Sequence, residues 1–169
     1  MDTIDMNPSF WKDNVNKATY WENFIAEFGK EFLKEYRLPE GDIVEYGSYK
    51  GNFINTLKNL YPLRKITGFD QDNLDNHKNI IELDIRNLSS MREYDCNIAF
   101  AINDIPIWEH SGLSKMAAYN HAMTNLVDGG YYLESRKEID KPEFISANKN
   151  LKFIKSTKNI VVFQRISET

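Results

Sequence analysis

Residues 42–53, DIVEYGSYKGNF, decide the fold of this chain. An apolar, strand-like run meets the acid Glu45, and two glycines, Gly47 and Gly51, follow before the sequence becomes helical. A strand, a glycine-containing turn and the start of a helix form a frame in which backbone groups can approach a small ligand closely. Tyr49 stands between the glycines, where glycine-rich loops usually carry a third glycine. The stretch therefore predicts a ligand-binding turn.

Strand-like and helical segments alternate beyond this turn. The strand-like segments are residues 43–46, 65–69, 79–83, 96–102, 131–134, 151–154 and 159–163. Helical spacing of apolar residues predicts helices over 52–61 and 113–127. This alternation indicates a parallel sheet with helices on both faces. Only four residues separate the final two strands, so that pair must be antiparallel. We predict an α/β domain with a mostly parallel seven-stranded sheet and an antiparallel last strand.

A further helix is predicted near the N-terminus, over residues 9–37. Its aromatic residues recur every four positions and form a stripe on one face: Tyr20, Phe24, Phe28, Phe32 and Tyr36. Either this helix covers one face of the core, or its aromatic residues also roof a ligand pocket. We expect one domain over 1–169, with an N-terminal helical cap (1–40) and a core (41–169).

The composition limits the class of protein. The chain has 169 residues, of which 41% are hydrophobic and 27% charged, as in ordinary globular domains. Its net charge of -4 disfavours a nucleic-acid partner, because such proteins usually carry a basic surplus. We expect no membrane segment, since no apolar run approaches about 20 residues, and the first residues show no basic signal region. The single cysteine, Cys96, excludes an internal disulfide. These features favour the cytoplasm.

Three acids stand at the ends of successive strands: Glu45, Asp70 and Asp84. The carboxyl ends of parallel strands share one edge of a sheet, and ligands bind there. A carboxylate at the end of the second strand can accept hydrogen bonds from two ribose hydroxyls. The spacing of Gly47 and Gly51 matches neither the dinucleotide fingerprint nor the phosphate loop. A nucleoside ligand without a pyrophosphate is therefore favoured.

These residues resemble the motifs of class I S-adenosylmethionine-dependent methyltransferases. Residues 45–53, EYGSYKGNF, are similar to the first motif of a subset of sugar and natural-product O-methyltransferases, which has the form E-x-G-x-Y-x-G. The resemblance extends over about residues 42–165 and includes the G-x-D of residues 68–70 and the L-x-x-G-G of residues 126–130. It implies the Rossmann-like methyltransferase fold and S-adenosylmethionine as the cofactor.

The resemblance also implies roles for individual residues. Glu45, Gly47, Tyr49 and Gly51 would surround the methionine arm, with Tyr49 or an aromatic of the N-terminal helix near the sulfonium through a cation–π contact. The helix that begins near Gly51 would offer amide donors to the cofactor's carboxylate. The remaining cofactor residues that it implies are Asp70 for the ribose, Asp84 and Ile85 for the adenine, and Asn103 at the end of the fourth strand.

The methyl acceptor is expected to bind after the fourth strand, where Asp104 and His110 are the candidate general bases. We expect a small or glycan-type acceptor with a hydroxyl or amine group, and no metal, because Asp104 alone does not make an octahedral oxygen site. The sequence from Asn103 to Pro106 lacks the N-P-P-Y pattern of amino and base methyltransferases. A homo-oligomer is one way to complete a site that lacks an evident lid.

The alternatives to a methyltransferase are a non-catalytic binding module or partner subunit and, less favoured, a dinucleotide-dependent oxidoreductase.

Overall fold

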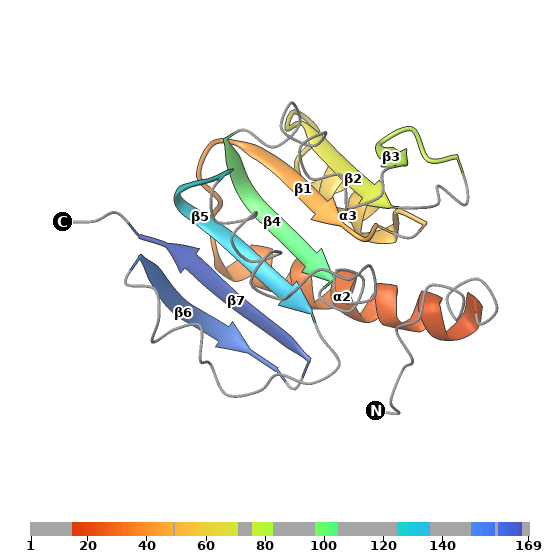
Figure 1. Cartoon of the computed structure of the whole chain (residues 1–169), viewed down its shortest axis with the longest axis horizontal. Helices are drawn as coiled ribbons and strands as arrows, with labels where there is room; N and C mark the ends of the chain where they lie inside the picture. Colours follow the sequence, from red (N-terminus) through yellow and green to blue (C-terminus); the bar gives the residue numbers. More distant parts are fainter. Residues whose placement is uncertain are drawn as a thin grey trace.

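The computed structural model describes residues 15–48, 50–70, 76–82, 97–104, 125–135, 150–157 and 159–166 (Figure 1). The predictions for Tyr49, Asp84, Ile85 and His110 lie outside these residues. The described part forms a single sheet with two helices against it.

Seven strands form this sheet in the order β3-β2-β1-β4-β5-β7-β6. Their bounds are β1 Asp42–Tyr46, β2 Ile66–Asp70, β3 Ile80–Glu82, β4 Ile98–Asp104, β5 Leu126–Ser135, β6 Leu151–Ser156 and β7 Ile160–Arg165. Strands β1 to β5 pair in parallel, whereas β7 runs antiparallel to both β5 and β6. The prediction of a mostly parallel seven-stranded sheet with an antiparallel last strand is confirmed. The strand order reverses between β1 and β4, and this switch point is where ligands bind in open α/β sheets.

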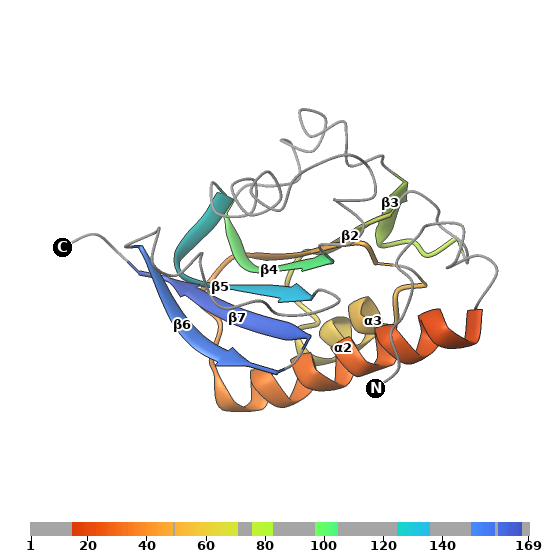
Figure 2. The same ribbon diagram turned by 60° about the horizontal axis from the view of Figure 1, so that its bottom comes forward.

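Two helices, α2 (Val15–Glu35) and α3 (Asn52–Leu60), lie on the same face of the sheet (Figure 2). Helix α2 ends two residues earlier than predicted. Leu38 precedes Pro39, and a residue before proline is driven out of the helical region. Helix α3 begins directly after Gly51, which has a φ of 86°.

The core between helices and sheet is mostly aliphatic, with a cluster of aromatic rings within it. Phe32 of α2 is fully buried, and its ring lies 6.0 Å from that of Phe100 and 5.2 Å from that of Tyr131. Phe53 of α3 meets Phe100 at 6.5 Å. Gly29 allows α2 to approach α3, because a Cβ at this position would overlap the ring of Phe53. Helix α2 therefore covers one face of the core, as the first of its two predicted roles requires.

Two element boundaries were predicted wrongly around β5 and β4. Leu126 and Val127 belong to β5 and not to the helix predicted over 113–127, whose residues 113–124 lie outside the described part of the chain. Leu126 pairs with Ile98 and Tyr131 with Phe100, so residues 127–130 form a bulge that includes Gly129, whose φ is +78°. Strand β4 starts at Ile98 and not at Cys96, because Asn97 has a left-handed φ of 57°, which asparagine tolerates better than most residues.

Candidate functional site at the carboxyl edge of the sheet

The turn after β1 is fixed to the end of β2 by hydrogen bonds. The N–H groups of Gly47 and Ser48 both donate to the carbonyl of Phe69, at 2.7 and 3.1 Å. The hydroxyl of Ser48 donates to the carbonyl of Glu45 at 3.0 Å. Ser48 fits there because Gly68 has no side chain, and a Cβ at that position would overlap Ser48 Oγ. The turn is thus held rigidly at the switch point of the sheet.

Both glycines of the turn adopt a conformation that side chains rarely take, with φ angles of 86°. Gly51 is additionally covered by His77, since a Cβ on Gly51 would lie 2.6 Å from His77 Cδ2. His77 Nδ1 accepts a hydrogen bond from the N–H of Asn79 at 3.1 Å, and its Nε2 lies 2.7 Å from Asn55 Oδ1. These partners require the Nε2–H tautomer. His77, which no sequence motif indicated, therefore packs against the turn from the side of β3.

Glu22 of α2 is the acid at this turn that the motifs did not indicate. Its Oε1 accepts a hydrogen bond from the N–H of Asn52 at 2.6 Å, while Asn52 Nδ2 donates to Asn23 Oδ1 at 3.0 Å. The Glu22 side chain is 6% exposed, and burial raises its pKa from the usual 4.5 to about 7. Its spacing in the sequence indicates this burial. Glu22 precedes the buried Ile25 and Ala26 by three and four residues, so it lies on the buried face of the helix.

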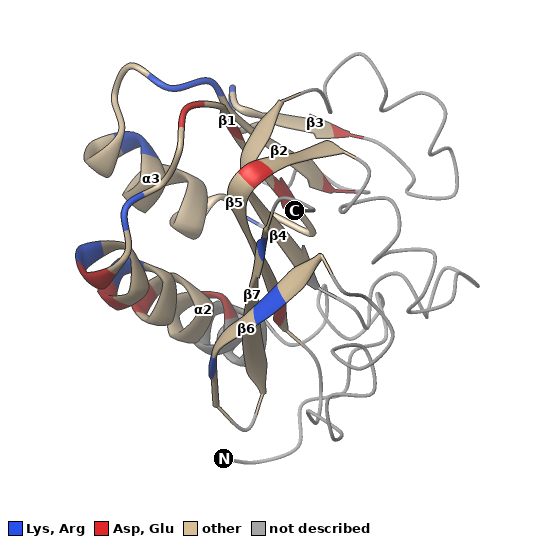
Figure 3. Ribbon diagram, turned by 90° about the vertical axis from the view of Figure 1, so that its left-hand side faces the viewer, with Lys and Arg blue, Asp and Glu red and all other residues tan. Residues whose placement is uncertain are grey.

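The structure brings several predicted residues to this edge. Glu45 is buried in β1 beside Gly68 of β2, and Asp70 ends β2 next to Glu82 of β3. In Figure 3, acidic residues occur on β2 and β3, basic residues occur on β6, and α2 carries residues of both signs. Asp104 is the last residue of β4, opposite Ser135 of β5. Glu45, Gly47, Gly51, Asp70, Asn103 and Asp104 are the predicted residues that this edge assembles.

Asn103 belongs to a buried polar chain that sequence patterns did not reveal. Its Nδ2 donates to the hydroxyl of Tyr132 at 3.3 Å, and that hydroxyl donates to Glu134 Oε1 at 2.8 Å. All three residues are at most 1% exposed. The chain links the ends of β4 and β5, so it fixes the side chain of Asn103 beside the switch point.

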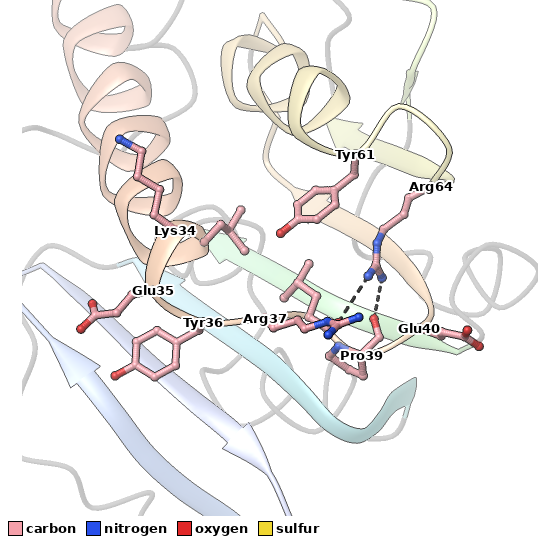
Figure 4. A pocket seen from close by; sticks show the side chains of 10 residues that line it. Lys34, Glu35, Tyr36, Arg37, Pro39, Glu40, Tyr61 and Arg64 are labelled. Atoms are coloured by element: carbon pink, nitrogen blue, oxygen red, sulfur yellow. Dashed lines mark hydrogen bonds between the residues drawn. The ribbon is translucent and has the colours of Figure 1, made fainter.

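A hollow of about 500 Å³ lies between the end of α2, the segment after it, and Tyr61 and Arg64 (Figure 4). Arg64 Nη1 donates to the carbonyls of Pro39 at 2.6 Å and Gly41 at 3.0 Å, and its guanidinium covers the ring of Tyr61 at 5.1 Å. Gly41 directly precedes β1, so this hollow lies at the amino end of the strand. The guanidinium of Arg64 is already used for contacts within the chain. We therefore do not regard this hollow as the candidate site.

Within the described residues, no helix is long and apolar enough to cross a membrane. The same part of the chain contains no group of three or more His, Cys, Asp or Glu residues placed to hold a metal ion.

The strand order, the antiparallel β7 and the glycine turn after β1 define the Rossmann-like methyltransferase fold. The resemblance seen in the sequence is thereby confirmed at the level of the fold. No protein-family model matches the chain, and no curated protein matches it in sequence.

Solved structures with this fold include three methyltransferases. The plantazolicin methyltransferase BpumL, in complex with S-adenosylhomocysteine (SAH), gives a TM-score of 0.65 at 10% identity over 95% of this chain and 91% of BpumL. MycE, from the mycinamycin biosynthetic pathway and in complex with Mg and SAH, gives 0.59 at 13% identity over 98% of this chain and 49% of MycE. The chain thus spans about half the length of MycE. CalS11, a TDP-rhamnose 3'-O-methyltransferase of calicheamicin biosynthesis, gives 0.58 at 18% identity over 91% of this chain and 84% of CalS11.

Proposed function

We propose that this chain is an S-adenosylmethionine-dependent methyltransferase for a small or glycan-type acceptor with a hydroxyl or amine group. The observation that carries the proposal is the glycine turn at the switch point, held to the end of β2 and flanked by the acids Glu45 and Asp70. The likeness to MycE, BpumL and CalS11 supports it, since each is a methyltransferase and CalS11 acts on a nucleotide sugar.

The residues at this edge fit a nucleoside that bears a cationic amino-acid arm. Glu22, Glu45 and Asp70 are carboxylates, and the first two are buried. A pyrophosphate would meet this negative charge unfavourably, whereas a sulfonium and an ammonium group would be attracted. The sharp turns at Gly47 and Gly51 let the backbone pass close to such an arm.

Each predicted residue receives a role in this proposal. Asp70 would accept hydrogen bonds from the ribose, and the others would line the methionine arm or the adenine: Glu45, Gly47, Tyr49, Gly51, Asp84, Ile85 and Asn103. When bound, S-adenosylmethionine would supply an electrophilic methyl group on its sulfonium. The chain would contribute mainly by placing the acceptor in line with that methyl group. Asp104 and His110 are the residues proposed to take the acceptor's proton.

Calorimetry with S-adenosylmethionine, SAH and NAD tests the proposal. We expect the two adenosyl compounds to bind and NAD not to bind. Asp70→Ala should abolish adenosyl binding, whereas the matched control Asp42→Asn, at the opposite end of β1, should retain it. Absence of binding by both adenosyl compounds to the unaltered protein would refute the proposed function. Binding without methyl transfer to any hydroxyl or amine acceptor would instead favour a non-catalytic module.

A further inference from the structure

The amide groups at the start of α3 already hold a carboxylate of this chain. The N–H of Asn52 donates to Glu22 Oε1 at 2.6 Å. The neighbouring N–H groups of Lys50 and Gly51 lower the pKa of the Glu22 carboxyl, although the N–H of Gly51 itself donates to the carbonyl of Ser48 at 2.9 Å. Consecutive N–H groups at a helix N-terminus form a typical anion site. The family resemblance implies that these amides are open to the carboxylate of the cofactor. In the structure, a ligand carboxylate would have to displace Glu22.

The second carboxylate oxygen of Glu22 is placed differently. Oε2 is buried and has no hydrogen-bond partner among the described residues. Leaving a buried carboxylate oxygen without a donor is unfavourable, and such a group in a native structure calls for a partner that the protein itself does not provide. A donor that arrives with a ligand would satisfy Oε2.

Two further carboxylates lie on the same face of the sheet as Glu22. Ile43 of β1 and Ile66 of β2 belong to the core beneath α2 and α3. Because side chains alternate along a strand, Glu45 and Asp70 project to that same face. Asp70 is close enough to Glu22 to raise its pKa further. This face of the carboxyl edge therefore concentrates negative charge around Oε2 and suits a positively charged donor.

We propose that Glu22 takes the place of the cofactor's carboxylate at the α3 amides and offers Oε2 to the cofactor's ammonium group. This assignment rests on the proposed function and adds a binding residue from the N-terminal helix to it. The amino-acid end of the cofactor is then recognised through its positive charge, and its carboxylate contributes little to binding.

The ionisation of Glu22 gives this arrangement a pH dependence. The raised pKa of about 7 reflects burial first, with the charge of Asp70 adding to it and the three backbone amides opposing it. A cation at Oε2 favours the ionised form, so cofactor binding releases a proton near neutral pH. Affinity should therefore increase as the pH rises from 6 to about 7.5, where an α-ammonium group is still mostly protonated, and a glutamine at position 22 should remove this increase.

Either Glu22 or the cofactor's carboxylate occupies the α3 amides in the complex. Calorimetry with S-adenosylmethionine and its decarboxylated form distinguishes these two arrangements without any substitution. If Glu22 fills the amides, the unaltered protein should bind both compounds with affinities within about threefold. Glu22→Gln should weaken both by tenfold or more at pH 7.5, because the amide group keeps the bond from Asn52 but carries no charge. Glu27→Gln, at an exposed position of the same helix, is the matched control and should bind both as the unaltered protein does.

Two results would overturn the inference while leaving the proposed function standing. One is a loss of tenfold or more when the cofactor lacks its carboxylate, which would place that carboxylate at the amides. The other is unchanged affinity in a folded Glu22→Gln variant. If the unaltered protein binds no adenosyl compound at all, the proposed function is refuted, and the inference that rests on it is refuted too.

Discussion

Ser48 occupies the space that a side chain at position 68 would need. Ser48 lies in the turn after β1 and Gly68 in the middle of β2, and a Cβ on Gly68 would overlap Ser48 Oγ. The hydroxyl of Ser48 is fixed by the carbonyl of Glu45, so it cannot move away without losing that bond. The absence of one side chain in β2 thus allows the turn after β1 to close.

Replacing Gly68 by alanine should therefore destabilise the protein by about 1–3 kcal/mol, as overpacking in a tight site usually does. The midpoint of urea denaturation measures this. When Ser48 is first replaced by glycine, the further change Gly68→Ala should cost much less stability than it costs in the unaltered protein. Equal destabilisation by Gly68→Ala with and without Ser48 would show that the two positions are not coupled.

Glu22 should make stability depend on pH. Its pKa in the folded protein, about 7, lies above the usual 4.5, so the folded state binds protons more tightly than the unfolded state. The stability that this group contributes is fully present below pH 4.5 and is lost as the pH rises through 7. At 1.36 kcal/mol per pKa unit, the loss between pH 4.5 and 8 is at most about 3 kcal/mol.

Urea denaturation at several pH values compares Glu22→Gln with the unaltered protein. The variant should gain stability relative to the unaltered protein as the pH rises, while Glu27→Gln should follow the unaltered protein at each pH. A constant difference between Glu22→Gln and the unaltered protein from pH 5 to 8 would contradict the buried, amide-bound carboxylate.

The hydroxyl of Tyr132 should contribute measurably to stability. It accepts a hydrogen bond from Asn103 and donates one to the buried Glu134. Tyr132→Phe removes both bonds and deprives a buried carboxylate of a donor, so we expect a loss of about 1–3 kcal/mol. Tyr131→Phe, next to it on β5, is the control, because no described residue forms a hydrogen bond with its hydroxyl. Thermal denaturation should show a lower melting temperature for Tyr132→Phe than for Tyr131→Phe.

The sequence predicted the site best where local signals were strong. Gly47 and Gly51 mark a turn that only glycine accommodates easily, and Asp70 follows a clear strand, so their placement at the edge could be anticipated. The start of β5 could not be anticipated, because Leu126 and Val127 fit a helical spacing as well as a strand. Pairing with Ile98, a tertiary contact, decides between the two.

Glu22 shows a different limit of sequence reasoning. An acid in an amphipathic helix is usually assigned to the solvated side, and only its spacing from Ile25 and Ala26 indicated otherwise. Its partner Asn52 lies thirty residues away, so no local pattern could reveal the bond. The link between Asn103 and Tyr132 is equally distant in the chain. The proposed roles of Tyr49, Asp84, Ile85 and His110 stay predictions.

The two outer strands of the sheet have a consequence for how molecules of this protein meet. Strand β3 has three residues, which gives an approaching strand little length to pair with. Strand β6 is longer and exposes Phe153, but it carries Lys152 and Lys155, and Lys155 reaches Glu35 of α2 at 3.5 Å. Short and lysine-bearing edge strands discourage edge-to-edge sheet extension. Among the described strands, both margins of the sheet therefore carry features that disfavour pairing with a strand of a second molecule.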